Sequence, residues 1–207
     1  MTDAEVAAAA EEVKMRGKRI IVHARSKGSV QQALRHGIRL IYHASFTDEE
    51  TLDQLEAVKH EVFVVPGIAI LYAMLNEAEA WGITKAQATA MGYQIEWDAA
   101  LESLSKMHKR GIRVLPGGDY GFAMTPHCQN ARDLEFFVKY LGMTPMEAIV
   151  SATRYGGTTH ELSPEWMPAS SMCSMMPPMT TAPVASATAS TSNSKASSRK
   201  RSMSTGR

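Results

Sequence analysis

Short apolar runs alternate with helix-like segments along the first three quarters of this 207-residue chain. A run of about four apolar residues is long enough for a parallel strand that is covered on both faces. Before three of these runs stands a glycine, the residue that accepts the left-handed conformation closing a helix. The predicted strands are residues 19–23, 39–43, 62–65 and 112–116. The pattern therefore predicts repeated helix–strand units in an α/β protein with a parallel sheet.

Polar capping residues mark the start of each predicted helix. Helices are expected at residues 3–16, 29–36, from about 47, 85–110, from 130 and 144–155, with a longer connection at 68–84. Four strand–helix units fit within residues 1–162, whereas a complete eight-unit barrel takes about 250 residues. We therefore expect a partial (β/α)8 TIM-type barrel of about four βα units. Its first and last strands need a cover, because the edges of an open sheet carry unpaired backbone groups.

The composition changes after residue 162. Residues 163–207 are rich in Ser and Thr and show no apolar periodicity. Such a segment cannot bury enough surface to offset its ordering entropy. Two regions are therefore expected, a partial barrel at residues 1–162 and a disordered C-terminal tail at 163–207. A basic run at 198–201 resembles a localisation patch, although a short charge cluster in a tail is more often only solvated.

Charge and hydropathy exclude several classes of protein. The formal net charge is +1, and most of the excess basic residues lie in the tail, so residues 1–162 offer no nucleic-acid surface. No run approaches the ~20 apolar residues of a membrane helix, and the N-terminus lacks the pattern of a signal peptide. Two cysteines in unlike segments make a disulfide framework improbable. We expect a cytoplasmic protein with no nucleic-acid and no membrane partner.

Two histidines and an aspartate follow three of the predicted strands. His23 and His43 end the first two strands, and Asp119 comes after the fourth. The carboxyl ends of parallel strands meet at one edge, where α/β proteins place their active sites. Two imidazoles and a carboxylate can ligate a divalent metal that activates water, while a carboxylate moves the proton. A lone histidine at a strand end more often only packs, but the repetition favours the metal interpretation.

These residues resemble the metal-dependent amidohydrolase superfamily, in the branch with imidazolonepropionase-like and Xaa-Pro dipeptidase-like enzymes. The resemblance covers residues 1 to about 157. Val22–Ser26 looks like the segment with the family's strand-five histidine, and Tyr42–Ala44 like the segment with its strand-six histidine. Val65–Gly67 looks like strand seven, and Gly117–Gly121 like the segment with the strand-eight aspartate. Residues 130–135 and 144–154 look like the two helices that follow.

The resemblance implies a (β/α)8 barrel that holds one or two divalent metals, usually zinc, and hydrolyses an amide or other C–N bond. It implies that His23 and His43 hold one metal, and that Asp119 ligates the other and acts as general base. The family's first-strand His-x-His pair and its fourth-strand bridging residue have no counterpart here. The sequence is therefore similar to strands five to eight, the C-terminal half of the barrel.

Three residues that follow the ligand candidates along the chain are candidate substrate contacts. Arg25 and Tyr120 are placed to touch a carboxylate or carbonyl, or else to stand at the rim. His127 lies in the loop after Asp119, where an exposed loop histidine is the plainer interpretation. The expected substrate is a small amide or a dipeptide-like molecule.

Two other functions stay open. One is a catalytically incompetent truncated fragment, or a non-enzymatic remnant of the family, that covers its barrel edges as a homo-oligomer. The other is an α/β binding module whose histidines only pack. Because part of the family's ligand set has no counterpart, we expect little turnover from these 207 residues alone.

Overall fold

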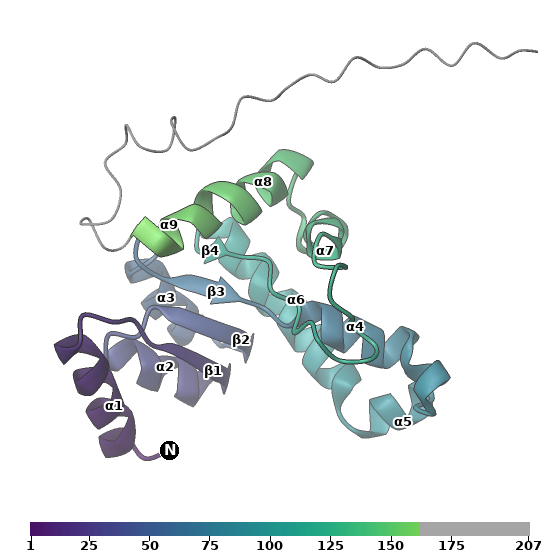
Figure 1. Ribbon diagram of the computed structural model, residues 1–207, viewed down its shortest axis with the longest axis horizontal. Coiled ribbons are helices and arrows are strands. Elements are labelled where there is room, and N and C mark those ends of the chain that lie inside the picture. Colours follow the sequence, from purple (N-terminus) through teal and green to yellow (C-terminus); the bar gives the residue numbers. More distant parts are fainter. Residues whose placement is uncertain (162–207) are drawn as a thin grey trace, which may run out of the picture. The chain divides into compact units, whose positions relative to one another are not determined.

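Four parallel strands form one sheet in the order β1-β2-β3-β4 (Figure 1). The computed structural model describes residues 1–161, all within one compact unit. The strands are β1 Ile21–Ser26, β2 Leu40–Phe46, β3 Phe63–Val65 and β4 Arg113–Val114. Their register aligns Ile21 with Leu40, Leu40 with Phe63, and Phe63 with Arg113. The predicted α/β class with a parallel sheet is confirmed, whereas the predicted disorder of 163–207 lies outside the described residues.

Helices connect the strands and follow the last one. They are α1 Asp3–Met15, α2 Lys27–Arg35, α3 Glu49–Ala57, α4 Ile68–Asn76, α5 Lys85–Ala90, α6 Tyr93–Lys109, α7 Arg132–Leu141, α8 Pro145–Val150 and α9 Gly156–Glu161, with a 3-10 turn Ala78–Trp81 and a π-helical turn Ser151–Tyr155. Thr2, Thr84 and Thr144 each close a capping box at the start of a helix. The polar caps in the sequence therefore mark true helix starts.

Three predicted helical or connecting segments and the ends of two predicted strands differ from the structure. The connection expected at 68–84 contains α4, whose residues are mostly buried; a helix that is apolar on nearly every side lacks the periodicity by which a helix is predicted. The helix expected at 85–110 is broken at Gly92, which has φ 95°. The last predicted helix continues through Gly156 and Gly157 to Glu161. β1 and β2 also run past His23 and His43, so the histidines do not end their strands.

Alternate residues of each strand face opposite sides of the sheet. Ile41, Val64 and Val114 belong to the main core, together with residues of α2, α3, α6 and α7. The opposite face carries a smaller apolar group of Leu40, Phe63, Leu115, Val65 and Tyr155. Helices thus cover one face of the sheet, and the other face is only partly covered.

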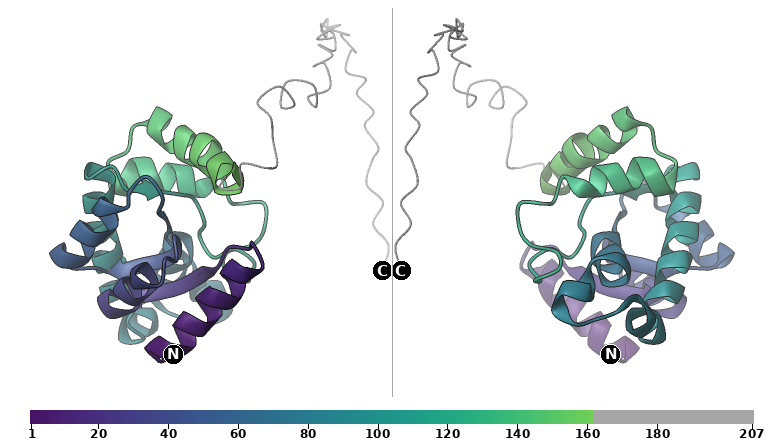
Figure 2. Two further views of the ribbon diagram at one scale, coloured as in Figure 1. Left: turned by 90° about the vertical axis from the view of Figure 1, so that its left-hand side faces the viewer. Right: turned by 90° about the vertical axis from the view of Figure 1, so that its right-hand side faces the viewer.

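The two ends of the described chain lie at opposite edges of the sheet. The helix α1 lies near β1, and the segment from α8 to α9 lies near β4 (Figures 1 and 2). On the partly covered face at the β1 edge, the Ile21 side chain is 50% exposed. Within residues 1–161, no helix is both long and apolar enough to span a bilayer. The cytoplasmic location stays a prediction.

Candidate active site

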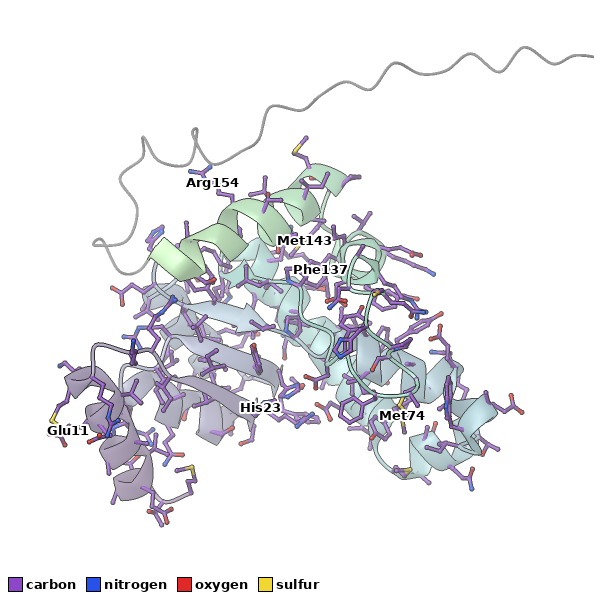
Figure 3. All side chains as sticks on the ribbon, in the orientation of Figure 1. Glu11, His23, Met74, Phe137, Met143 and Arg154 are labelled. Carbon is purple, nitrogen blue, oxygen red and sulfur yellow. The ribbon has the colours of Figure 1, made fainter. Side chains whose placement is uncertain are left out.

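His23 and His43 meet at the C-terminal ends of neighbouring strands. His23 lies in β1 and His43 in β2, and their Nδ1 and Nε2 atoms are 2.8 Å apart. His23 also stands edge-on to Tyr42, with ring centroids 5.2 Å apart. Figure 3 shows His23 at the arrowhead end of the sheet, where the loops leading to the next helices begin. The structure therefore brings the two predicted imidazoles together.

A β-bulge directs His43 toward His23. His43 and Ala44 have φ values of 76° and 50°, in the left-handed region that residues other than glycine rarely adopt. The register shifts at this point, since Ala24 pairs with His43 but Ser26 pairs with Phe46. Strict alternation would send His43 to the helix-covered face with Ile41, and the bulge breaks that alternation. The strained backbone lies at the site itself, which is where such strain is usually retained.

Asp119 approaches the histidines from the loop after β4. Its Oδ2 atom is 3.8 Å from His43 Nε2, and its φ of 56° is also left-handed. Gly67, between β3 and α4, lies against both side chains. A Cβ atom placed on Gly67 would be 2.9 Å from His43 Nδ1 and 3.0 Å from Asp119 Oδ2. All four strands or the loops after them therefore contribute to one small polar cluster.

The interior keeps His43 uncharged near neutral pH. Burial, and then the positive charge of Arg25, lower the pKa of His43 to about 4, although Asp119 acts in the opposite direction. The His43 side chain is 3% exposed. A neutral imidazole is the form that ligates a metal. Its electrostatic environment therefore suits a metal ligand.

The cluster has the donor atoms of a metal site but not the spacing of one. Among residues 1–161, no three His, Cys, Asp or Glu side chains are arranged to hold a metal ion. Two imidazole nitrogens on one tetrahedral zinc lie about 3.3 Å apart, given Zn–N bonds of about 2.0–2.1 Å. The 2.8 Å contact between His23 and His43 is too short for that. Because His23 is exposed, a change of its rotamer can open the spacing.

Comparisons with known proteins point to one superfamily. No family model matches the chain. Ochratoxinase of Aspergillus niger is 29% identical over 148 residues, which are 69% of this chain and 28% of that protein. A putative prolidase from Bifidobacterium longum has a similar structure, with a TM-score of 0.64, 25% identity and coverage of 74% of this chain and 38% of that one. The resemblance to the amidohydrolase superfamily is confirmed.

Two further solved structures share this amidohydrolase-like fold. The crystal structure of A. niger ochratoxinase gives a TM-score of 0.61 at 24% identity over 74% of this chain and 33% of that one. A Xaa-Pro dipeptidase with methionine bound in its active site gives 0.62 at 23% identity over 76% of this chain and 37% of that one. The chain thus spans less than a third of the length of the curated ochratoxinase it matches.

Arg25 stands beside the histidines with a fixed direction. Its Nε atom donates to Glu96 Oε1 at 2.7 Å, and Ser45 Oγ donates to the same oxygen at 2.9 Å. The Arg25 side chain remains 46% exposed, whereas Glu96 is 17% exposed. Arg25 therefore lies beside this amidohydrolase-like site and is partly open to solvent.

Tyr120 and His127 are less well placed for a substrate. The Tyr120 hydroxyl donates to Oδ1 of the buried Asp133 at 2.9 Å, and burial raises the pKa of Tyr120. His127 is exposed, and its ring lies over Gly121. Of the three candidate substrate contacts, only Arg25 acts on the histidine pair, because its positive charge lowers the pKa of His43.

Sequence reasoning missed three residues of this site. Glu96 lies in the first turn of α6, far along the chain from Arg25, and no local pattern links the two. Gly67 follows the strand that carries no ligand, so its closeness to His43 is visible only in three dimensions. Asp133 looks like an ordinary acidic residue in the first turn of α7, yet it is 1% exposed, and burial raises its pKa to about 6. The only sequence signal was the polar character of that helix start.

Proposed function

We propose that this protein is a metal-dependent amidohydrolase-type hydrolase that cleaves an amide or other C–N bond with a metal-activated water. The observation that carries the proposal is the convergence of His23, His43 and Asp119 at the carboxyl ends of parallel strands. Left-handed backbone at His43 and Asp119 supports it, because the fold bears a local cost to aim these side chains at one another.

We further propose that the sheet is a partial (β/α)8 barrel equivalent to strands five to eight of the superfamily. Strands in sequence order, all parallel, with helices packed on one face, support this assignment. The solved relatives match this chain over only 33% to 38% of their own length. Residues 1–161 bring together His23, His43 and Asp119, and we call this metal site a half-site, whose affinity should be lower than that of the superfamily's full set of ligands.

Each site residue has a distinct role in the proposed reaction. His23 and His43 would hold a divalent metal, which we propose is zinc, and the Asp119 carboxylate would be a further metal ligand. Such a metal, when bound, polarises the scissile carbonyl and makes water acidic. Asp119 accepts the proton of the attacking water and passes it to the leaving nitrogen. His43 is buried and its pKa is lowered, so it is in the neutral form that ligates a metal.

Arg25 indicates the substrate class. The Arg25 side chain is half-exposed, Glu96 holds it through Nε, and its charge acts on the nearby His43. Guanidinium groups bind carboxylates with two parallel hydrogen bonds. We therefore propose a small amide with a free carboxylate, such as a dipeptide or an N-acyl amino acid. The names of the relatives, ochratoxinase and Xaa-Pro dipeptidase, are compatible with a small amide or dipeptide.

Zinc titration tests the metal half-site. His23→Ala and His43→Ala should each lower the zinc affinity of the purified chain by at least about tenfold, because each removes a proposed ligand. A competing chromophoric chelator gives the affinities. His60 is exposed and lies in the turn between α3 and β3. His60→Ala is the matched control and should leave zinc affinity unchanged. Equal zinc affinity in all four proteins would refute the half-site.

A second candidate function is that of a non-enzymatic chain that associates with itself. The partly covered sheet face and the 50% exposed Ile21 at the β1 edge favour it. A two-fold axis parallel to the strands would place β4 of each copy beside β1 of the other, giving eight parallel strands without open edges.

Sedimentation measurements test the self-association. The wild-type chain should sediment as a dimer, and Ile21→Lys should yield monomers, because a charge at the strand edge opposes pairing. Ile95→Lys, at a position 67% exposed on α6, should leave the dimer intact. A wild-type chain that is monomeric at all concentrations would exclude this second candidate.

A further inference from the structure

Asp133 is a buried carboxylate that the proposed reaction does not use. It lies in the first turn of α7 and is 1% exposed. A carboxylate is costly to bury unless other groups bond to it. The groups that bond to the Asp133 carboxylate therefore explain how it can be buried here.

The loop that carries Asp119 wraps around the Asp133 carboxylate. Tyr120, the residue after Asp119, donates its hydroxyl to Asp133 Oδ1 at 2.9 Å. Gly118, the residue before Asp119, lies so close that a Cβ atom on it would be 2.7 Å from the same oxygen. The backbone N–H groups of Gly117 and Gly118 also face the carboxylate, although Asp133 Oδ2 has no hydrogen-bond partner of good geometry among the described residues. Asp133 thus contacts the chain on both sides of Asp119.

The conformation of Asp119 needs such support. Its φ of 56° lies in a sparsely populated region, which persists only where the surroundings determine it. Two other contacts hold the same loop, since Ile70 N donates to Gly118 O at 3.1 Å and Thr125 Oγ1 donates to Asp119 O at 2.9 Å. Both of those partners bind backbone oxygens. Asp133 supplies the acceptor for the donors of the loop.

We propose that Asp133 is a positioning residue, whose buried carboxylate holds the residues on both sides of Asp119 and so directs the Asp119 side chain toward His43. The inference rests on the proposed function in one respect, that Asp119 acts on a metal and a proton. The positioning of the loop can be measured without bound metal and without a measurement of proton transfer.

Zinc affinity in Asp133→Asn gives the first test. The new amide keeps an oxygen acceptor for Tyr120 but turns N–H donors toward the N–H groups of the glycines. Zinc affinity should fall about 10- to 100-fold, the usual effect of removing a group that orients a ligand. In an Asp119→Asn background the same change should have little further effect, because it acts through Asp119. Glu135→Gln, an exposed acid in the same helical turn, is the matched control and should leave affinity unchanged.

Amide hydrogen exchange without zinc gives the second test. Exchange at Gly118 and Asp119 should be at least about tenfold faster in Asp133→Asn, with unchanged exchange in the core strands. If the wild-type chain binds no zinc, the proposed function fails, but this readout still decides the positioning. Unchanged exchange at both amides in Asp133→Asn would overturn the inference. So would a loss of zinc affinity on Asp133→Asn that is equal in the wild-type and the Asp119→Asn backgrounds. Tyr120→Phe, which removes a single hydrogen bond, gives the same readouts with smaller effects if Asp133→Asn does not fold.

Discussion

Gly67→Ala is expected to separate His43 from Asp119 and to weaken zinc binding about 10- to 100-fold. The added methyl group would lie 2.9 Å from His43 Nδ1 and 3.0 Å from Asp119 Oδ2, tighter than ordinary van der Waals contact, so these side chains must shift. His43 has little room to retreat, because it is 3% exposed and its backbone is fixed by the β2 bulge. Overpacking of this kind typically costs about 1–3 kcal/mol in the free energy of unfolding. Zinc titration and thermal unfolding measure the two effects.

A second glycine provides the control for this substitution. Gly28 lies in the first turn of α2, and a Cβ atom there would meet nothing within 4 Å. Gly28→Ala should leave zinc affinity unchanged and leave the free energy of unfolding equal or raise it by up to about 1 kcal/mol, since alanine favours a helix over glycine. A Gly67→Ala protein that behaves like Gly28→Ala would show that the close packing at Gly67 does not hold the site together.

Asp119→Asn is expected to lower amide hydrolysis about a thousandfold in any form of the protein that shows such hydrolysis. The isosteric amide cannot accept the proton of water, and general base catalysis usually contributes about 10²- to 10⁴-fold. Asparagine tolerates left-handed φ as well as aspartate does, so the loop and the fold should be retained. The rate is measured with zinc present, on dipeptides and N-acyl amino acids that carry a free carboxylate.

The matched control for the aspartate is an exposed one. Asp98 on α6 is exposed, and Asp98→Asn removes the same charge from the surface. It should hydrolyse the substrates at the wild-type rate. If Asp119→Asn also retains most of the activity while circular dichroism shows a folded protein, another group must accept the proton.

The sequence predicted the sheet better than it predicted the site. Strands 19–23 and 39–43 could be recognised because short apolar runs follow helix-ending glycines, and this is a local signal. The spacing of the site depends on the bulge at His43 and Ala44, which no residue type announces, because neither is a glycine or an asparagine. Strict alternation would have sent His43 away from His23.

Long-range contacts explain the rest of what was missed. Arg25 was predicted as a substrate contact, but its partner Glu96 is 71 positions away in the chain. The sequence predicts the same role for Tyr120, and the structure adds a bond from its hydroxyl to Asp133, a buried acid in the first turn of α7 that no local pattern links to Tyr120. Burial of a single charged side chain depends on the packing of the whole loop, and a sequence pattern of charges does not contain that information.

The strand order also bears on how the molecule assembles. Each strand pairs with the next one along the chain, so β1, β2 and β3 can join through short helical connections. The connection from β3 to β4 spans residues 66–112 and contains three α-helices and a 3-10 turn, so its closure costs more chain entropy and is slower. We infer that β4 joins the sheet last. Since Asp119 follows β4, the carboxylate reaches the two histidines only when the rest of the sheet has formed.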